Sequence, residues 1–213
     1  MSTLVPPQRA TWHRDVVLSD GRVYPLRNRL SEDIRGDISD EALGLTGEQS
    51  RASTAVHELG HAMVWLASGL HVQYLGVGIG PGGQAACKAV TKTPQELMAR
   101  VTGVVAGERA QDRWLRETGL WTSDLAAMAE LGAAHDRAYV FACGPEPQPG
   151  FGDGQVDYSV LHDLADVALD AIWGKLMTAL PILTRVGKMT GDELANHVGL
   201  RNGPAPAAQR GHS

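Results

Sequence analysis

The chain has 213 residues, a formal net charge of -5 at pH 7, 43% hydrophobic residues and 20% charged residues. This composition is typical of a globular chain and not of a disordered one, and the length suffices to bury a core without disulfides. Because the balance is acidic and the basic residues are scattered, we expect no nucleic-acid partner.

Cysteine usage and the N-terminal sequence bear on the compartment. Cys87 and Cys143 lie far apart and form no CxxC pair, so neither a cysteine metal site nor a disulfide framework is indicated. The first fifteen residues contain no apolar core of a secretory signal, and no run of about 18 apolar residues occurs. We therefore expect a cytoplasmic protein without membrane insertion.

Residues 1–47 differ from the rest of the chain and are interpreted as an N-terminal extension of unknown role. Two short β-type stretches flank Ser19-Asp20-Gly21, and an Asp-Gly pair between such stretches predicts a hairpin. Residues 31–47 are polar and contain three glycines, which indicates a loop or short helical turns.

Residues 48–200 alternate between helical and extended patterns. Apolar residues at helical spacing predict a helix from about residue 46 to 67, and the stretch from Val72 to Ile79 predicts a strand. That strand enters a glycine cluster at 78–83, and residues 85–90 could pair with it. We interpret residues 74–79 as a possible edge strand on which an extended substrate could pair.

Four more helices are expected downstream. Thr93, Pro94 and Glu96 form a capping-box pattern for a helix that continues to about residue 115. Further helices are predicted over residues 124–142, 158–180 and 190–198, and the tail 201–213 is expected to be disordered. The predicted fold class is α+β and predominantly α, a helical bundle with a small glycine-rich β-sheet.

The segment His57-Glu58-Leu59-Gly60-His61 contains the motif HExxH on a predicted helix. Residues four apart lie on one face of a helix, so both imidazoles can bind one Zn²⁺ ion. Glu58 points roughly 100° away from His57 and can take a proton from a metal-bound water without binding the metal itself. The motif predicts metal-dependent hydrolysis with Glu58 as the general base.

A catalytic zinc usually takes a third protein ligand. The metzincin pattern would require Gly at 64 and His at 67, where the chain has Val64 and Ala67, so that class is rejected. No acidic residue occurs from 62 to 95. The first acidic candidates downstream are Glu96, Glu108, Asp112, Glu117 and Asp124.

Several stretches resemble the zinc peptidase domain of FtsH-type proteases (peptidase family M41). AVHELGHAMVWLASG resembles the active-site helix of that family, and VTGVVAGERAQD is similar to its second-helix motif. TGLWTSDLAAMAELGAAH resembles its GA-x-x-DL-x-x-AT-x-x-A segment, and ALDAIWGKLMTALPILTRVGKMTGDEL is similar to its terminal helices. The resemblance covers about residues 50–200 and implies an M41-like zinc peptidase domain over 48–200.

The resemblance implies that Asp124, the Asp of the DL segment, is the third ligand beside His57 and His61. Glu108 remains the main rival, as a ligand on the preceding helix or as a residue that orients a histidine. His135 and His162 are weaker rivals. Unlike that family, the chain contains no GxxxxGK[ST] motif for an ATPase, and Met128 replaces the T of the AT pair.

The expected function is ATP-independent zinc metallopeptidase activity on a protein or peptide substrate. A homo-oligomer or an unfoldase acting in trans are possible partners. Two alternatives stay open at this point: a zinc-fold regulatory or binding protein without proteolysis, and a dedicated repressor-cleaving regulatory peptidase.

Overall fold

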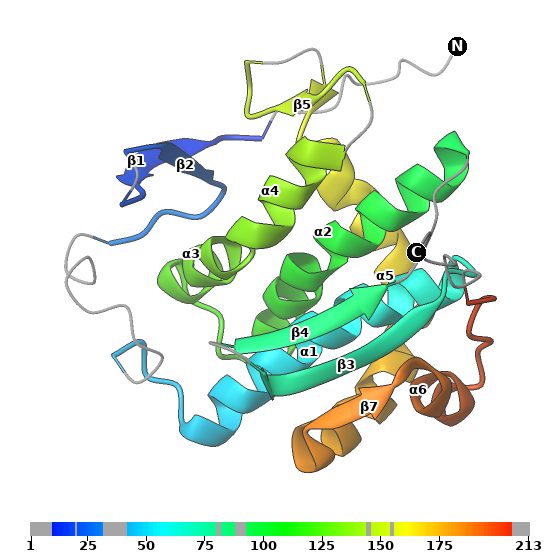
Figure 1. Cartoon of the computed structure of the whole chain (residues 1–213). Helices are drawn as coiled ribbons and strands as arrows, with labels where there is room; N and C mark the ends of the chain where they lie inside the picture. Colours follow the sequence, from blue (N-terminus) through cyan, green and yellow to red (C-terminus); the bar gives the residue numbers. More distant parts are fainter. Residues whose placement is uncertain are drawn as a thin grey trace, which may run out of the picture.

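A computed structural model describes residues 10–19, 21–31, 42–79, 82–87, 93–143, 146–153 and 156–205. Within these residues the fold is α+β and mostly helical, as predicted. In chain order (Figure 1) the elements are β1 (His13–Val17), β2 (Val23–Leu26), α1 (Gly47–Ala67), β3 (Val72–Ile79), β4 (Gly82–Cys87), α2 (Pro94–Glu117), α3 (Ser123–Gly132), α4 (Ala134–Cys143), β5 (Pro149–Gly150), β6 (Val156–Asp157), α5 (Ser159–Val186), β7 (Lys188–Thr190) and α6 (Gly191–Val198).

Helix α1 is the central element of the fold. It begins after Thr46, whose side chain accepts a hydrogen bond from the Gln49 backbone while Gln49 bonds back in a capping box. All residues from 55 to 66 are buried, and the helix contacts α2, α5, β3 and β4. A helix that is buried all round belongs in a core, so the HExxH residues lie inside the protein.

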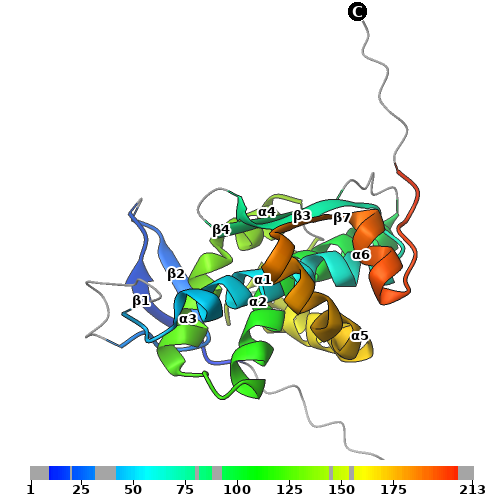
Figure 2. The ribbon, with the colours of Figure 1, turned by 90° about the horizontal axis from the view of Figure 1, so that it is seen from below.

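The main sheet has the strand order β4-β3-β7, with antiparallel pairing throughout. It lies on one side of α1, and α5 lies on the other side (Figure 2). Strand β3 has the predicted bounds, but it is the middle strand, so our interpretation of residues 74–79 as an edge was wrong. Among the described residues β4 is the strand on the edge beside α1. It begins at Gly82, before the predicted start at 85, and residues 88–90 lie outside the described part of the chain.

Helix α2 packs directly against α1, and the predicted capping box at Thr93 starts it. The two backbones approach closely because small residues line the contact. A Cβ atom added at Gly60 of α1 would lie 2.5 Å from the Ala106 carbonyl oxygen of α2 and 2.7 Å from Ala110 Cβ. This contact brings the middle of α2 onto the HExxH turn of α1.

Residues 124–142 form two helices, so the prediction of one continuous helix was wrong. Helix α3 ends at Gly132, the chain turns at Ala133, and α4 starts at Ala134. Gly132 weakens a helix at this point. The turn also lets Arg137 of α4 reach Glu108 of α2 at 3.1 Å while it keeps a 2.9 Å contact with Glu130 of α3.

The N-terminal hairpin is present, with β1 and β2 paired antiparallel. Gly21 has a φ of 82°, which suits glycine in the turn, and Asp20 lies outside the described residues. Tyr24, Leu26 and Leu30 form a small apolar cluster with Ala127 of α3. The hairpin segment therefore packs against α3, while residues 32–41 of the predicted loop lie outside the described residues.

Helix α5 is long and apolar enough, by length and composition, to cross a membrane. In the fold 39% of its most apolar window is buried, and the helix contacts α1 and α2. Core helices of globular domains have the same composition. The absence of membrane insertion therefore stays a prediction.

The chain continues past α6 along the sheet. The Asn202 side-chain Nδ2 donates a hydrogen bond to the Val72 carbonyl oxygen at 2.9 Å, and the Gly203 backbone N–H donates one to the Leu70 carbonyl oxygen at 3.3 Å. Residues 202–203, which we expected in a disordered tail, are thus bound to the core. Residues 206–213 of that tail lie outside the described residues.

Candidate metal centre

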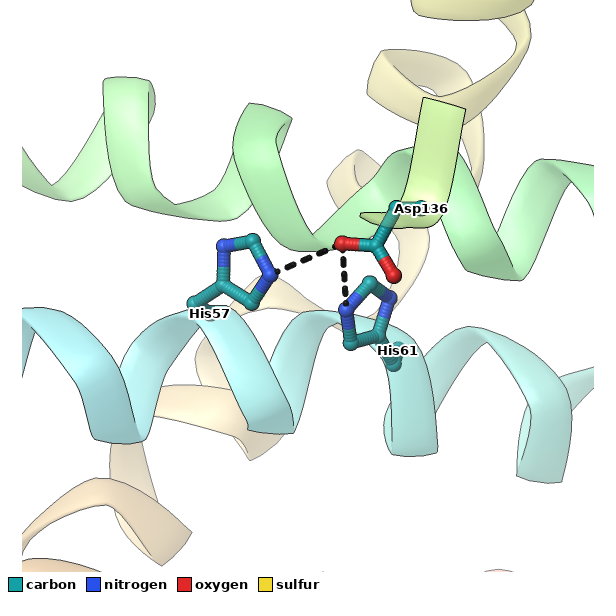
Figure 3. A group of neighbouring side chains, drawn as sticks. All are labelled: His57, His61 and Asp136. Carbon is teal, nitrogen blue, oxygen red and sulfur yellow. Dashed lines mark hydrogen bonds and ion pairs between the residues drawn. The ribbon is translucent and has the colours of Figure 1, made fainter. Parts of the chain in front are cut away.

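Two imidazoles and one carboxylate meet in the core. His57 and His61 project from the same face of α1 toward Asp136 of α4 (Figure 3). The Oδ2 atom of Asp136 lies 3.2 Å from His57 Nε2 and 3.4 Å from His61 Nε2. One ligand atom from each residue lies within 4.8 Å of the others, so the group could hold a metal ion.

The donor set and the spacing fit zinc. Ligand bonds of about 2.0–2.2 Å in a tetrahedron place neighbouring ligand atoms roughly 3.3–3.6 Å apart. The two separations from Asp136 Oδ2, 3.2 and 3.4 Å, are close to that range. Two neutral imidazoles and a carboxylate form a ligand set that catalytic zinc sites use, with one position left for water.

Each histidine has an acceptor on its other ring nitrogen. His61 Nδ1 lies 2.8 Å from the Gly103 carbonyl oxygen, and His57 Nδ1 lies 3.1 Å from Gln111 Oε1. Gln111 is held in turn by a 2.8 Å bond from its Nε2 to Ser53 Oγ. An acceptor at Nδ1 keeps a proton there, so Nε2 is the nitrogen that a metal ion would bind in place of its contact with Asp136.

Glycine in α2 makes room for the two rings. A Cβ atom added at Gly107 would lie 2.4 Å from His61 Cε1 and 2.8 Å from His57 Nε2. At Gly103 the same atom would lie 2.1 Å from Trp65 Nε1. The Trp65 indole stacks on the His61 ring with centroids 5.5 Å apart, so the imidazole is enclosed by α2 on one side and an indole on another.

Glu58 lies on the β4 side of α1 and is 6% exposed. A Cβ atom added at Gly83 of β4 would lie 2.6 Å from Glu58 Oε1, so this strand contacts the carboxylate directly. Burial raises the pKa of Glu58, the charges of His57 and His61 lower it, and that of Asp136 raises it, with a net rise. A carboxylate with a raised pKa is a stronger base near neutral pH.

In the metal-free protein the pKa values of His61 and Asp136 depend on each other. Burial lowers the pKa of His61, but the charges of Asp136 and Glu58 and the hydrogen bonds to Asp136 and Gly103 together outweigh burial and raise that pKa to about 9. Burial raises the pKa of Asp136, but the charge of His61 and the hydrogen bonds of both histidines hold that pKa well below its usual range. Asp136 is therefore an anion at neutral pH, and a bound cation would displace the proton of His61.

Asp124, the predicted third ligand, is placed elsewhere. Its Oδ1 accepts a hydrogen bond from the Ser31 backbone N–H at 2.6 Å, and its Oδ2 lies 3.2 Å from Ser31 Oγ. It stands in the first turn of α3, where the helix dipole favours a carboxylate. The structure thus brings Asp136, and not Asp124, to the two histidines.

Glu108, the rival residue, is also outside the group. It is 3% exposed and forms ion pairs with Arg137 and with His162, and these charges bring its pKa to about 2 against the opposing effect of burial. The bonds that orient His57 and His61 come from Gln111 and Gly103 instead. Glu108 therefore binds another histidine, His162, and Arg137 of α4, the helix whose Asp136 faces the site.

Asp136, Gln111 and the Gly103 carbonyl were missed by sequence reasoning. One partial signal for Asp136 was present: Gly132 and Ala133 stand four and three residues before it, as the GA pair does in the motif of the FtsH-type peptidases, although Arg137 replaces the Leu that follows the motif Asp. Leu120 and Trp121 stand at the same places before Asp124. No pattern in the sequence marks Gln111.

No model of a known protein family matches this sequence. No curated protein matches it either.

Proposed function

We propose that this protein is a zinc-dependent peptidase that hydrolyses peptide bonds without ATP. His57, His61 and Asp136 would hold the ion, and Glu58 would act as general base. The observation that carries the proposal is the shared approach of both Nε2 atoms to Asp136 Oδ2, at 3.2 and 3.4 Å, beside a buried glutamate.

Zinc bound there would supply a Lewis acid that polarises a carbonyl and makes water acidic enough to lose a proton near neutral pH. Glu58 would accept that proton, which its raised pKa favours, and would return it to the departing amine, which is the stronger base. Trp65 and the helix contacts around His61 exclude solvent from the inner side of the site.

The substrate is proposed to be a protein or peptide in extended form. Among the described residues β4 lies at the edge of the main sheet, and its Gly83 contacts Glu58. An edge strand offers unpaired backbone N–H and C=O groups to which an extended chain can add. Such a chain would pass the general base.

The resemblance to FtsH-type peptidases supports the same proposal. With Asp136 in the place of the motif Asp, Gly132 and Ala133 match its GA pair, whereas Arg137 stands where the motif has Leu and Val140 and Phe141 stand where it has AT. The residues proposed for the reaction lie in α1 and α4.

The test is hydrolysis of fluorescein-labelled casein by the wild type and by Glu58→Gln, with zinc content measured in both. We expect about one zinc per chain in each protein and hydrolysis by the wild type alone, at least 100-fold above the variant. Equal hydrolysis by both would contradict the role of Glu58. Bound zinc with no hydrolysis by either would favour the non-proteolytic binding protein.

A further inference from the structure

The helix that carries Asp136 has little buried surface of its own. Only Arg137 and Val140 are buried among the ten residues of α4. A helix of this length is not stable in isolation and depends on its tertiary contacts. The contacts of Arg137 and Val140 therefore set the orientation of α4 and the direction in which Asp136 points.

Arg137 binds three elements at once. Its Nε donates to Glu108 Oε2 of α2 at 3.1 Å, its Nη2 donates to Glu130 Oε2 of α3 at 2.9 Å, and its Nη1 donates to the Pro25 carbonyl of β2 at 2.7 Å. The guanidinium is planar, and its donors have fixed directions. These three acceptors therefore hold α4 against rotation about its own axis.

Rotation of α4 matters because Arg137 directly follows Asp136. Adjacent helical residues point about 100° apart, so an Arg137 side chain anchored in the core leaves Asp136 facing α1. Aromatic rings surround the anchor, with the guanidinium carbon 5.0 Å from the Tyr24 ring centroid and 5.4 Å from that of Tyr158. The anchor is 2% exposed, and water cannot substitute freely for its partners.

The N-terminal segment secures the same anchor from the other side. Glu130 Oε1 accepts from the Asn28 backbone N–H at 3.0 Å and from Asn28 Nδ2 at 2.8 Å, and Glu130 Oε2 accepts from the Arg27 N–H at 2.8 Å. The Tyr24 hydroxyl donates to the Glu130 carbonyl at 2.9 Å. Residues 24–28 thus hold the Glu130 carboxylate where Arg137 can bind it.

We propose that Arg137 is the positioning residue of the metal centre, and that residues 24–28 of the N-terminal segment lock it in place. The hairpin segment then belongs to the support of the site, although none of its described residues is among the proposed ligands. The functional consequence rests on the proposed zinc site, whereas the holding of α4 does not.

The experiment measures amide hydrogen exchange in the metal-free protein and zinc affinity by competition with a chromophoric chelator. In Arg137→Lys, which keeps the charge but loses the three fixed donors, we expect α4 amides to exchange at least 10-fold faster while α1 amides stay protected. Zinc affinity should fall about 10- to 100-fold, as it does when residues that orient metal ligands are lost.

Two further variants keep the test decisive. Tyr24→Phe/Asn28→Ala removes two side-chain hydrogen bonds to Glu130 and leaves the Arg137 contacts present. It should speed amide exchange in α4 and lower zinc affinity, each by less than Arg137→Lys does. This variant still tests the proposal if Arg137→Lys fails to fold. Leu194→Ala removes a fully buried side chain of α6, away from α4, as a control for general loss of stability.

The proposal is overturned if α4 stays as protected as in the wild type, or if α1 and α4 lose protection equally, as general destabilisation would cause. A wild type that binds no zinc would remove the proposed function. The exchange data would still decide whether Arg137 and residues 24–28 hold α4.

Discussion

Gln111 Oε1 lies 3.1 Å from His57 Nδ1, and Gln111 Nε2 donates to Ser53 Oγ at 2.8 Å. Because the amide nitrogen is committed to Ser53, the amide oxygen faces the imidazole and accepts its Nδ1 proton. In a metal-bound form the lone pair on His57 Nε2 would then face the ion, in place of the hydrogen bond that this nitrogen makes to Asp136 in the metal-free protein. A residue of α2 thus selects the tautomer of His57, a proposed ligand on α1.

Gln111→Ala should weaken zinc binding about 10- to 100-fold, because His57 loses the acceptor that orients its ring. Chelator competition measures this directly, and casein hydrolysis at limiting zinc should fall in parallel. Gln73→Ala, at an exposed position of β3, is the matched control and should leave both values unchanged. Unchanged affinity in Gln111→Ala would contradict the orienting role.

Gly107→Ala should abolish stoichiometric zinc binding. The added Cβ atom would lie 2.4 Å from His61 Cε1 and 2.5 Å from His61 Nε2, so the ring must leave its position. Gly174→Ala introduces the same change in α5, where nothing lies within 4 Å of the new atom. That control should retain zinc and gain roughly 0.5–1 kcal/mol in unfolding free energy from helix propensity. Full zinc content in Gly107→Ala would show that the rings do not occupy this space.

The two aspartates should behave differently when neutralised. Asp136→Asn removes the charged ligand and should lower zinc content measured by mass spectrometry to a small fraction of one ion per chain. Asp124→Asn should keep zinc and lose about 1 kcal/mol of stability, since it weakens the bonds to Ser31. The reverse pattern would restore Asp124 as the third ligand.

The ionised Glu108 carboxylate should stabilise the fold by an amount that falls as the pH drops through the acidic range. Burial opposes ionisation, but the charges of Arg137 and His162 bring the pKa of Glu108 from 4.5 to about 2. A depressed carboxyl pKa in the folded state contributes stability that is complete above the unfolded pKa and is lost as pH falls toward the folded one. Urea unfolding of wild type and Glu108→Gln should differ by on the order of 3 kcal/mol at pH 7. The difference should shrink between about pH 4.5 and about pH 2, and a constant difference across that window would contradict the ion pair.

Local signals in the sequence predicted much of the fold. The capping box at Thr93, the apolar spacing from 46 to 67 and the strand at 72–79 all correspond to observed elements, because each is decided within a few residues. His57 and His61 follow from the same local geometry, since residues four apart share a helix face. The pair of histidines also predicted that an acidic side chain would lie close to both rings, but it did not say which one.

The identity of that acidic residue depends on contacts distant in sequence. The alanine-rich composition of residues 124–142 suits an uninterrupted helix, and Gly132 weakens that helix near Ala133 without forcing a turn there. The turn is stabilised by Arg137, whose partners Glu108 and Pro25 lie 29 and 112 residues away. The helical pattern of residues 124–142 alone therefore does not show that Asp136 faces α1. Gly132 and Ala133, which precede Asp136 as the GA pair precedes the motif Asp, could have indicated it.

The most direct test of the central claim is an anomalous diffraction map, collected at the zinc absorption edge, from crystals of the protein purified with zinc. We predict one strong peak bonded to His57 Nε2, His61 Nε2 and Asp136 Oδ2, with Glu58 facing it but not bound. A peak coordinated by Asp124 or Glu108, or no peak between the two histidines, would contradict the metal centre described above.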